Sequence, residues 1–239
     1  MLTRVKRLLR AFAYEAWNHG PMESGARLHE HQTPAELFGT IYREKQWGGE
    51  GHDFYSGSGS HTAHVIDPYV AAVRACLAAL PTPPVVVDLG CGDFAAGGRV
   101  ADLAQQYHAC DVVPELIARN RGLGTAPHIH FHLLDATSDP LPPGDVVIVR
   151  QVFQHLSNDH VAAIVRKLSP YPLWIITEHL PRGRFVANRD FRPGERTRLP
   201  VNSGIVLTEE PFRITPATAD VLCEVLERGD PIRTIAYRF

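Results

Sequence analysis

The chain has 239 residues, a length that suits one α/β domain with additions, and 44% of them are hydrophobic, as in proteins that bury a core. Its formal net charge of -2 provides no general attraction to nucleic acid or membranes. No stretch reaches the roughly 18 apolar residues of a membrane span, and the four cysteines lack metal-binding spacing, so we expect a cytoplasmic protein with reduced thiols.

Residues 1–68 are expected to form a cap of helices and loops. Apolar residues at helical spacing predict an amphipathic helix over 2–17, which packs on the domain or a second subunit or, as the alternative, on a membrane or nucleic acid. A connector over 18–34 and a helix over 35–47 follow. The segment 48–68 is rich in glycine and serine but also carries aromatic and histidine side chains, which a plain linker would not need. We expect it to fold over a ligand site, with a surface loop as the alternative.

From residue 69 the chain alternates between helices and strands. Helices are predicted over 69–80, 98–106 and 113–121 and from Ser157 or Asn158, and strands over 85–89, 107–110, 129–134, 145–149 and 173–177. This alternation predicts a parallel sheet that binds ligands beyond the carboxyl ends of its strands. Residues 219–226 and 232–239 predict a terminal hairpin, although 221–227 also fits a short helix.

The stretch Val85–Phe94, VVVDLGCGDF, carries the main binding motif. Gly90 and Gly92 allow the backbone to approach a ligand, and the start of the predicted helix after them would favour an anionic or polar group. With Asp111 about 20 residues further on, the pattern also satisfies a dinucleotide fingerprint. Asp88, however, would place a carboxylate close to the pyrophosphate of a dinucleotide, whereas it suits a ligand that carries an ammonium group.

The sequence Asp88-Leu89-Gly90-Cys91-Gly92 resembles the first motif of the class I S-adenosylmethionine (SAM)-dependent methyltransferases. The resemblance covers residues 80–180. It implies SAM as the cofactor and a Rossmann-like α/β fold, a seven-stranded, mostly parallel sheet of order 3-2-1-4-5-7-6 with strand 7 antiparallel and helices on both faces. The expected SAM-binding domain spans 69–239, with an insertion at 181–213. The whole chain also resembles bacterial methyltransferases encoded among glycan and surface-polysaccharide genes.

The resemblance assigns the cofactor site to nine positions near the ends of four strands: Asp88, Gly90, Gly92, Asp111, Val112, Asp135, Ala136, Arg150 and Gln151. The two glycines would line the turn under the methionine part of SAM, and Asp88 would reach its amino group. Asp111 would accept hydrogen bonds from both ribose hydroxyls, and Asp135 would accept one from the adenine amino group. Each acid has an alternative role as a turn residue or helix cap.

Methyl transfer to a hydroxyl benefits from a base that removes the proton. His155, after the fourth strand, is the first candidate because imidazole titrates near neutrality, and a structural role is its alternative. His179 and Glu178, at the end of the fifth strand, are rival candidates. No metal is expected, because the three alternating histidines of 128–132 have no further ligand spaced to complete a site.

The insertion at 181–213 is rich in arginine. Its arginines are Arg182, Arg184, Arg189, Arg192, Arg196, Arg198 and Arg213. Since guanidinium groups suit phosphate and carboxylate, the insertion predicts an anionic group on the acceptor, with a solvated surface loop as the alternative.

The residues after the fourth strand favour oxygen as the methylated atom. This sequence has Arg-Gln-Val-Phe at 150–153, where many amino-methylating nucleic-acid enzymes carry a motif of the N-P-P-Y type. We therefore expect O-methylation of a sugar or another small polar acceptor, which includes anionic ones. The partner is expected to be a small molecule or glycan and not nucleic acid, and a homodimer is left open. A nicotinamide (NAD)-dependent oxidoreductase and a non-catalytic SAM-binding regulator are the alternatives.

Overall fold

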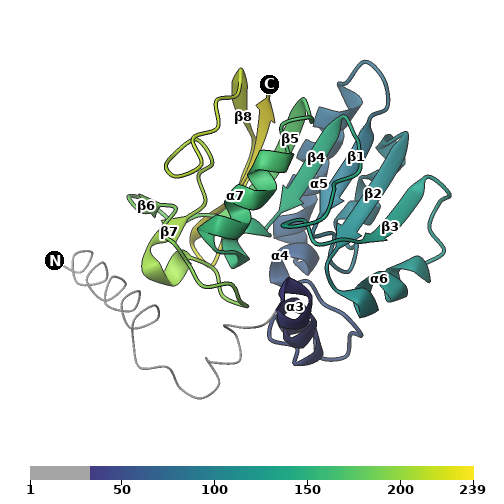
Figure 1. The fold of residues 1–239 in the computed structure, drawn as a ribbon, viewed down its shortest axis with the longest axis horizontal. Coiled ribbons are helices and arrows are strands. Elements are labelled where there is room, and N and C mark those ends of the chain that lie inside the picture. Colours follow the sequence, from purple (N-terminus) through teal and green to yellow (C-terminus); the bar gives the residue numbers. More distant parts are fainter. Residues whose placement is uncertain (1–32) are drawn as a thin grey trace.

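A seven-stranded sheet of order β3-β2-β1-β4-β5-β9-β8 forms the centre of the computed structural model, which describes residues 33–239 (Figure 1). Strands β1 to β5 pair in parallel, and β9 is antiparallel to both of its neighbours. The order and directions confirm the predicted fold class. The predicted helix over 2–17 and all but the end of the predicted connector lie outside the described residues.

The strands of the main sheet lie close to their predicted positions. They are β1 (Val85–Leu89), β2 (Gln106–Asp111), β3 (Ile129–Leu133), β4 (Val146–Arg150), β5 (Leu173–His179), β8 (Thr218–Glu227) and β9 (Asp230–Arg238). Arg228 and Gly229 join β8 to β9 with φ angles of 52° and 90°, as a two-residue hairpin turn requires. The predicted hairpin is therefore confirmed, and the alternative helix over 221–227 is wrong. The insertion contains a small parallel pair, β6 (Val186–Ala187) and β7 (Ser203–Gly204).

The described helices are α3 (Pro34–Arg43), α4 (Ser58–His61), α5 (Ala63–Ala78), α6 (Pro114–Arg121) and α7 (Asn158–Lys167). Ser157 caps α7 by accepting a hydrogen bond from the His160 N–H, as its sequence predicted. Helix α5 starts at Ala63 rather than at residue 69 and continues through Pro68, so part of the predicted loop is helical. Among residues 33–239, no helix is both long and apolar enough to span a bilayer.

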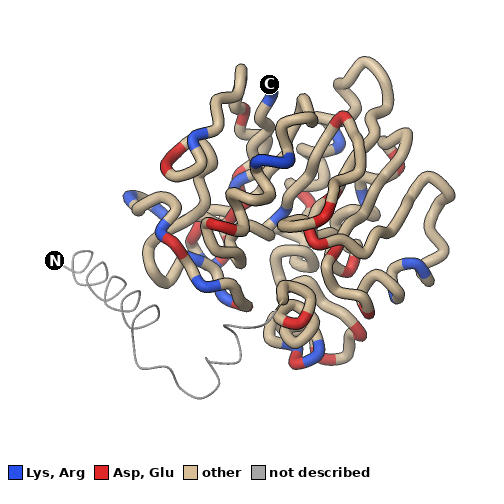
Figure 2. Tube along the Cα trace, in the orientation of Figure 1, with Lys and Arg blue, Asp and Glu red and all other residues tan. Residues whose placement is uncertain are grey.

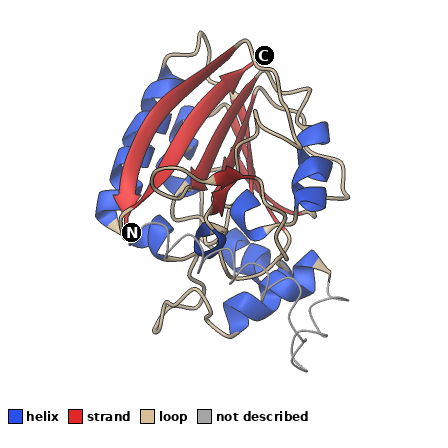
Figure 3. Cartoon of the chain, turned by 90° about the vertical axis from the view of Figure 1, so that its left-hand side faces the viewer, coloured by secondary structure: helices blue, strands red, loops and turns tan. Residues whose placement is uncertain are grey.

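Helices lie on both faces of the sheet (Figure 3), and a hydrophobic cluster fills the space on each face. Because side chains alternate along a strand, Val86 belongs to the cluster that includes Val73 of α5, and Val87 belongs to the cluster that includes Ile164 of α7. The central strands are thus buried on both faces, which explains their continuous apolar sequences.

The region after the glycine turn differs from the prediction. Two short 3₁₀ turns, Gly97–Arg99 and Ala101–Leu103, stand where a helix over 98–106 was expected, and β2 already begins at Gln106. Two consecutive glycines at 97 and 98 disfavour a helix by roughly 1 kcal/mol each relative to alanine, and the connection is short. The expected N-terminus of a helix facing the ligand is therefore wrong.

Candidate active site

A cavity of about 630 Å³ lies beyond the carboxyl ends of the parallel strands. Its walls come from the cap segment, which we define as residues 34–60, from the ends of β1, β2, β4 and β5, from the insertion and from the β8–β9 turn. All nine residues that the resemblance assigned to the cofactor line it, as do His155 and His179. Glu178 does not line it.

The glycine turn after β1 is shaped by close contacts. Gly90 has a φ angle of 75°, and a Cβ atom there would lie 2.4 Å from Val152 Cγ2. A Cβ atom on Gly92, with a φ of 56°, would lie 2.3 Å from Ser56 Oγ. The N–H groups of residues 90 and 91 both donate to the Cys110 carbonyl, so β2 fixes the turn. Larger residues at either glycine would displace the turn or the cap segment.

Two buried acids flank the turn. Asp111 accepts hydrogen bonds from the backbone N–H groups of Gly92 (3.0 Å) and Val113 (3.1 Å), and burial outweighs these bonds and raises its pKa. Asp88 accepts a hydrogen bond from the Tyr107 hydroxyl (2.9 Å), and burial raises its pKa to about 7. Both carboxylates have local partners and also border the cavity.

The third predicted acid, Asp135, closes a turn after β3. Its Oδ1 accepts hydrogen bonds from the backbone N–H and the hydroxyl of Thr137, at 2.8 Å and 2.6 Å. The turn role that the sequence offered as an alternative is thus present in the structure. Asp135 and Ala136 nevertheless line the cavity, so this turn is a part of its wall.

Arg150, at the end of β4, ties the cap segment to the sheet. Its guanidinium donates to Ser60 Oγ (2.9 Å) and to the Gly59 carbonyl, and it lies 4.7 Å from the centre of the Tyr69 ring. Burial lowers its pKa. Gln151 adopts a φ angle of 55° beside it, and both residues line the cavity.

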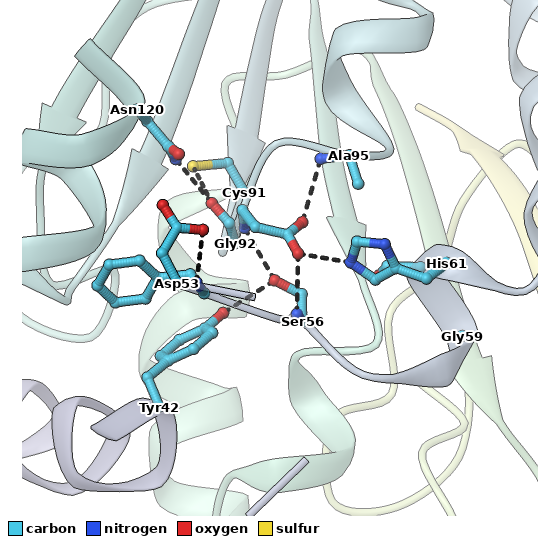
Figure 4. A network of polar contacts seen from close by, with 12 residues as sticks. Tyr42, Asp53, Ser56, Gly59, His61, Cys91, Gly92, Ala95 and Asn120 are labelled. Carbon is cyan, nitrogen blue, oxygen red and sulfur yellow. Dashed lines mark hydrogen bonds and ion pairs between the residues drawn. The ribbon is translucent and has the colours of Figure 1, made fainter. Parts of the chain in front are cut away.

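A polar network holds the cap segment against the glycine turn (Figure 4). Asp93 accepts hydrogen bonds from the Ser56 N–H (3.0 Å) and contacts His61 Nε2 at 2.6 Å, while its own N–H donates to Ser56 Oγ (2.8 Å). Tyr42, from α3, bonds Ser56 Oγ at 3.0 Å. The glycine- and serine-rich segment therefore lies over the glycine turn.

His155 has partners on both ring nitrogens. Nδ1 lies 3.2 Å from the carbonyls of Gly194 and Arg196, and Nε2 lies 3.2 Å from Gln154 Nε2. Because Nδ1 must donate to the carbonyls, Nε2 accepts from the Gln154 amide. Burial lowers the pKa of His155 to about 4, so the ring is neutral at pH 7. These contacts are those of a structural histidine, the alternative role that was considered for His155.

His179 has a different environment. Its Nδ1 lies 3.7 Å from Glu227 Oε2, and its buried Nε2 has no hydrogen-bond partner among residues 33–239. Burial lowers the pKa of His179, opposed by the charge of Glu227. The neighbouring Glu178 is buried away from the cavity, and burial raises the pKa of Glu178 to about 8. Of the three predicted bases, His179 alone combines a place on the wall with an unpartnered nitrogen.

The arginine-rich insertion does not bring its arginines into the cavity. Its lining residues are Glu195, Thr197 and Leu199, whereas its basic residues are spread along the loops beside β6 and β7 (Figure 2). Arg198 is fully buried and donates to Asn158 Oδ1 and the Leu156 carbonyl, which anchors the insertion to α7. None of the insertion's arginines lines the cavity, so an anionic acceptor held by this insertion stays a prediction.

The histidine-rich strand lies at the sheet edge, away from the cavity wall. His108 Nδ1 lies 3.0 Å from His132 Nε2, and His130 Nε2 lies 2.6 Å from Gln106 Oε1. Within residues 33–239, no group of three or more histidine, cysteine or acidic side chains is arranged to hold a metal ion.

Several wall residues were not identified from the sequence. Ser58 and Glu227 meet at the cavity through a hydrogen bond of 2.5 Å although they are 169 positions apart. Asp93 directly follows the glycine motif, and Asp230 is the last residue of the predicted hairpin turn. An acidic residue at each of these two turns was the sequence feature that could have indicated a wall residue. The partners of these acids, however, are distant in sequence.

Comparisons with known proteins agree with this architecture. Residues 86–170 match a family model described as a methyltransferase domain, and a search of curated proteins found no significant match. The N-methyltransferase NodS from Bradyrhizobium japonicum WM9, in complex with S-adenosyl-L-homocysteine, has a TM-score of 0.59 at 12% identity, over 83% of this chain and 97% of that chain. The 1,6-didemethyltoxoflavin-N1-methyltransferase of Burkholderia thailandensis has a TM-score of 0.56 at 16% identity, over 91% of both chains.

The family match falls on the strands that carry the glycine turn and the three acids. Residues 86–170 match the methyltransferase domain family, and the described sheet has the fold of these solved methyltransferases. Magnesium protoporphyrin IX methyltransferase from Synechocystis PCC 6803, with bound SAM, is similar to this domain at 16% identity and a TM-score of 0.53, over 87% of this chain and all of that chain. At such identities these structures establish the fold of the methyltransferase domain and leave its acceptor open.

Proposed function

We propose that this protein is a SAM-dependent O-methyltransferase that modifies a hydroxyl of a sugar or another small polar acceptor. The observation that carries the proposal is His179, whose buried Nε2 has no partner among the described residues and belongs to a side chain that lines the cavity. A ring nitrogen with a free lone pair can take the proton of a hydroxyl as its oxygen attacks, once rotation of the His179 side chain brings the buried Nε2 to the cavity surface. The acids proposed to seat the cofactor line the same cavity, so base and cofactor seat share one space.

The residues around the glycine turn fit SAM, which supplies an activated methyl group when bound. Asp111 is held by two backbone N–H donors, and a carboxylate has about four lone-pair sites, so it can also accept both ribose hydroxyls. Asp88 suits the ammonium group of the methionine part. Val112 would pack on the adenine face, and Asp135 with the Ala136 N–H would meet the adenine edge.

Carboxylates outnumber arginines on the cavity wall. The acidic lining residues are Asp88, Asp93, Asp111, Asp135, Glu195, Glu227 and Asp230. The arginines that line it are Arg150 and Arg228. Carboxylates accept hydrogen bonds from hydroxyls and repel phosphate and carboxylate groups. This balance supports a hydroxylated acceptor without negative charge and argues against the anionic acceptor.

Two observations oppose the alternative functions. A dinucleotide site places the pyrophosphate at the N-terminus of a helix directly after the glycine turn, but 3₁₀ turns follow the glycine turn here. Asp88 also borders the cavity close to that position. A buried ring nitrogen without a hydrogen-bond partner lowers the stability of the fold. A purely regulatory SAM-binding protein has no use for such an imidazole on the cavity wall.

Calorimetric titration with SAM, S-adenosylhomocysteine and NAD tests the cofactor first. Binding of the first two without NAD is expected, and binding of NAD alone would refute the proposal. A screen of neutral, cationic and anionic sugars then detects S-adenosylhomocysteine as the product. In that assay His179→Ala should lower turnover about 100-fold or more while retaining SAM binding, whereas the exposed control His64→Ala should behave as the wild type. Full activity of His179→Ala would contradict the assigned base.

A further inference from the structure

Glu227 lies between His179 and Ser58, and these three side chains come from three distant parts of the chain. His179 ends β5, Glu227 ends β8, and Ser58 begins α4 in the cap segment. Ser58 Oγ donates to Glu227 Oε1 at 2.5 Å, and Glu227 Oε2 lies 3.7 Å from His179 Nδ1. The carboxylate therefore uses one oxygen toward the cap segment and the other toward the histidine.

The hairpin fixes the position of Glu227. It pairs with Asp230 across the two-residue turn, so it is the last paired residue of β8, and β9 lies between it and the carboxyl end of β5. Its side chain is 13% exposed and the His179 side chain is 8% exposed, so little water competes for the contact between them. A carboxylate at this place needs a partner, and Ser58 supplies a donor.

The nearby charge of Glu227 favours a proton on one of the two ring nitrogens of His179. An ionised carboxylate only accepts hydrogen bonds, so it favours a proton on the nitrogen nearest to it, which is Nδ1. The lone pair of neutral His179 then lies on Nε2, the atom without a partner among residues 33–239. The backbone of Asp230 and Glu227 and the carboxylate of Asp230, on β9, also favour the protonated ring.

We propose that Glu227 and Ser58 are positioning residues, with Glu227 holding His179 in the Nδ1–H tautomer and Ser58 holding Glu227 in place. The proposal rests on the proposed role of His179 as base. In this proposal the cap segment covers the cofactor and also helps to orient the base, because Ser58 belongs to the cap segment.

The anchoring of the cap segment supports this coupling. On either side of Ser58, Asp93 holds Ser56 and His61, and Arg150 holds Ser60 and the Gly59 carbonyl. Ser58 therefore has a fixed backbone on both sides, and its hydroxyl lies at a defined place above the hairpin. When the cap segment is seated, the glycine turn, the end of β4 and the Glu227 carboxylate are all bound to it.

The tautomer of His179 can be measured on the full chain without an acceptor. Imidazole ¹⁵N resonances distinguish the Nδ1–H and Nε2–H forms, and the His179 signals are identified by their absence from the spectrum of His179→Gln. The wild type should show the Nδ1–H form. Glu227→Gln should lower the pKa of His179 and populate the Nε2–H form, because it removes the adjacent negative charge. Ser58→Ala should change the pKa and the tautomer of His179 in the same direction, by a smaller amount.

Glu224→Gln is the matched control, since Glu224 lies on the same strand but pairs with Arg233 on the surface. It should leave the His179 signals unchanged. An Nε2–H form in the wild type, or the same tautomer and pKa in Glu227→Gln as in Glu224→Gln, would overturn the positioning role while leaving the proposed function intact. If Glu227→Gln does not fold, Ser58→Ala carries the same test. Full activity of His179→Ala would instead refute the base and, with it, this proposal.

Discussion

Removing the Asp111 carboxylate provides the sharpest test of the cofactor seat. The side chain is held by the N–H groups of Gly92 and Val113, so it is oriented before any ligand arrives. Asp111→Ala removes acceptors for the ribose hydroxyls. A hydrogen bond to a charged group contributes about 1.5 to 3 kcal/mol, so loss of one such bond should weaken SAM binding about 10- to 150-fold. The two backbone donors would also lose their acceptor, which should lower the free energy of unfolding by about 1 to 3 kcal/mol.

Calorimetric titration measures the affinity, and denaturant titration measures the stability of the same variant. Asp102→Ala is the matched control, because Asp102 is an exposed carboxylate paired with Arg74 far from the cavity wall. It should bind SAM as the wild type does. Wild-type affinity in a folded Asp111→Ala protein would show that the ribose contacts lie elsewhere, and equal weakening by both variants would show that the effect is not local.

Three further changes test other contacts. Asp93→Asn weakens the contact with His61 and should increase hydrogen exchange across residues 54–61; unchanged protection would show that the cap segment is held elsewhere. Gly90→Ala should lower the free energy of unfolding by at least about 1 kcal/mol, because residue 90 has a φ of 75°. Gly98→Ala has only ordinary contacts and is its control in thermal melts. In the folded protein, buried Glu178 keeps its proton up to about pH 8, whereas the unfolded chain releases it near 4.5, so the unfolding free energy contributed by Glu178 falls as pH rises between these values. Glu178→Gln should flatten that slope in denaturant titrations, and an unaltered slope would contradict the buried neutral carboxyl.

The sheet could be predicted from the sequence because its signals are local. The apolar β-branched residues of β1 and β4 indicate strands buried on both faces, and Gly229 marks the position of the turn between β8 and β9, which is shorter than predicted. The acids that follow the strands then meet at one edge, since parallel strands end on the same side. For this reason all nine predicted cofactor residues lie on one cavity.

The cap segment could only partly be predicted. Its aromatic and histidine residues indicated a role near the ligand, but Asp93 and His61 are 32 positions apart, and no local pattern pairs them. The helix expected over 98–106 is absent for a different, local reason. Its apolar residues fit helical spacing, yet the two glycines and the early start of β2 leave only short 3₁₀ turns.

The choice of base shows where sequence reasoning ends. His155 and His179 both follow strands and have the same intrinsic pKa, so the sequence cannot separate their roles. Their partners separate them: Gln154 and two carbonyls occupy both ring nitrogens of His155, whereas Nε2 of His179 is unpartnered among the described residues. Gln154 connects the two histidines. Its Oε1 accepts a hydrogen bond from the backbone N–H of His179 at 3.1 Å, while its amide nitrogen lies against the His155 ring. Gln154 therefore contacts the ring of His155 and the backbone of His179. These contacts support a structural role for His155 and the proposed role of base for His179.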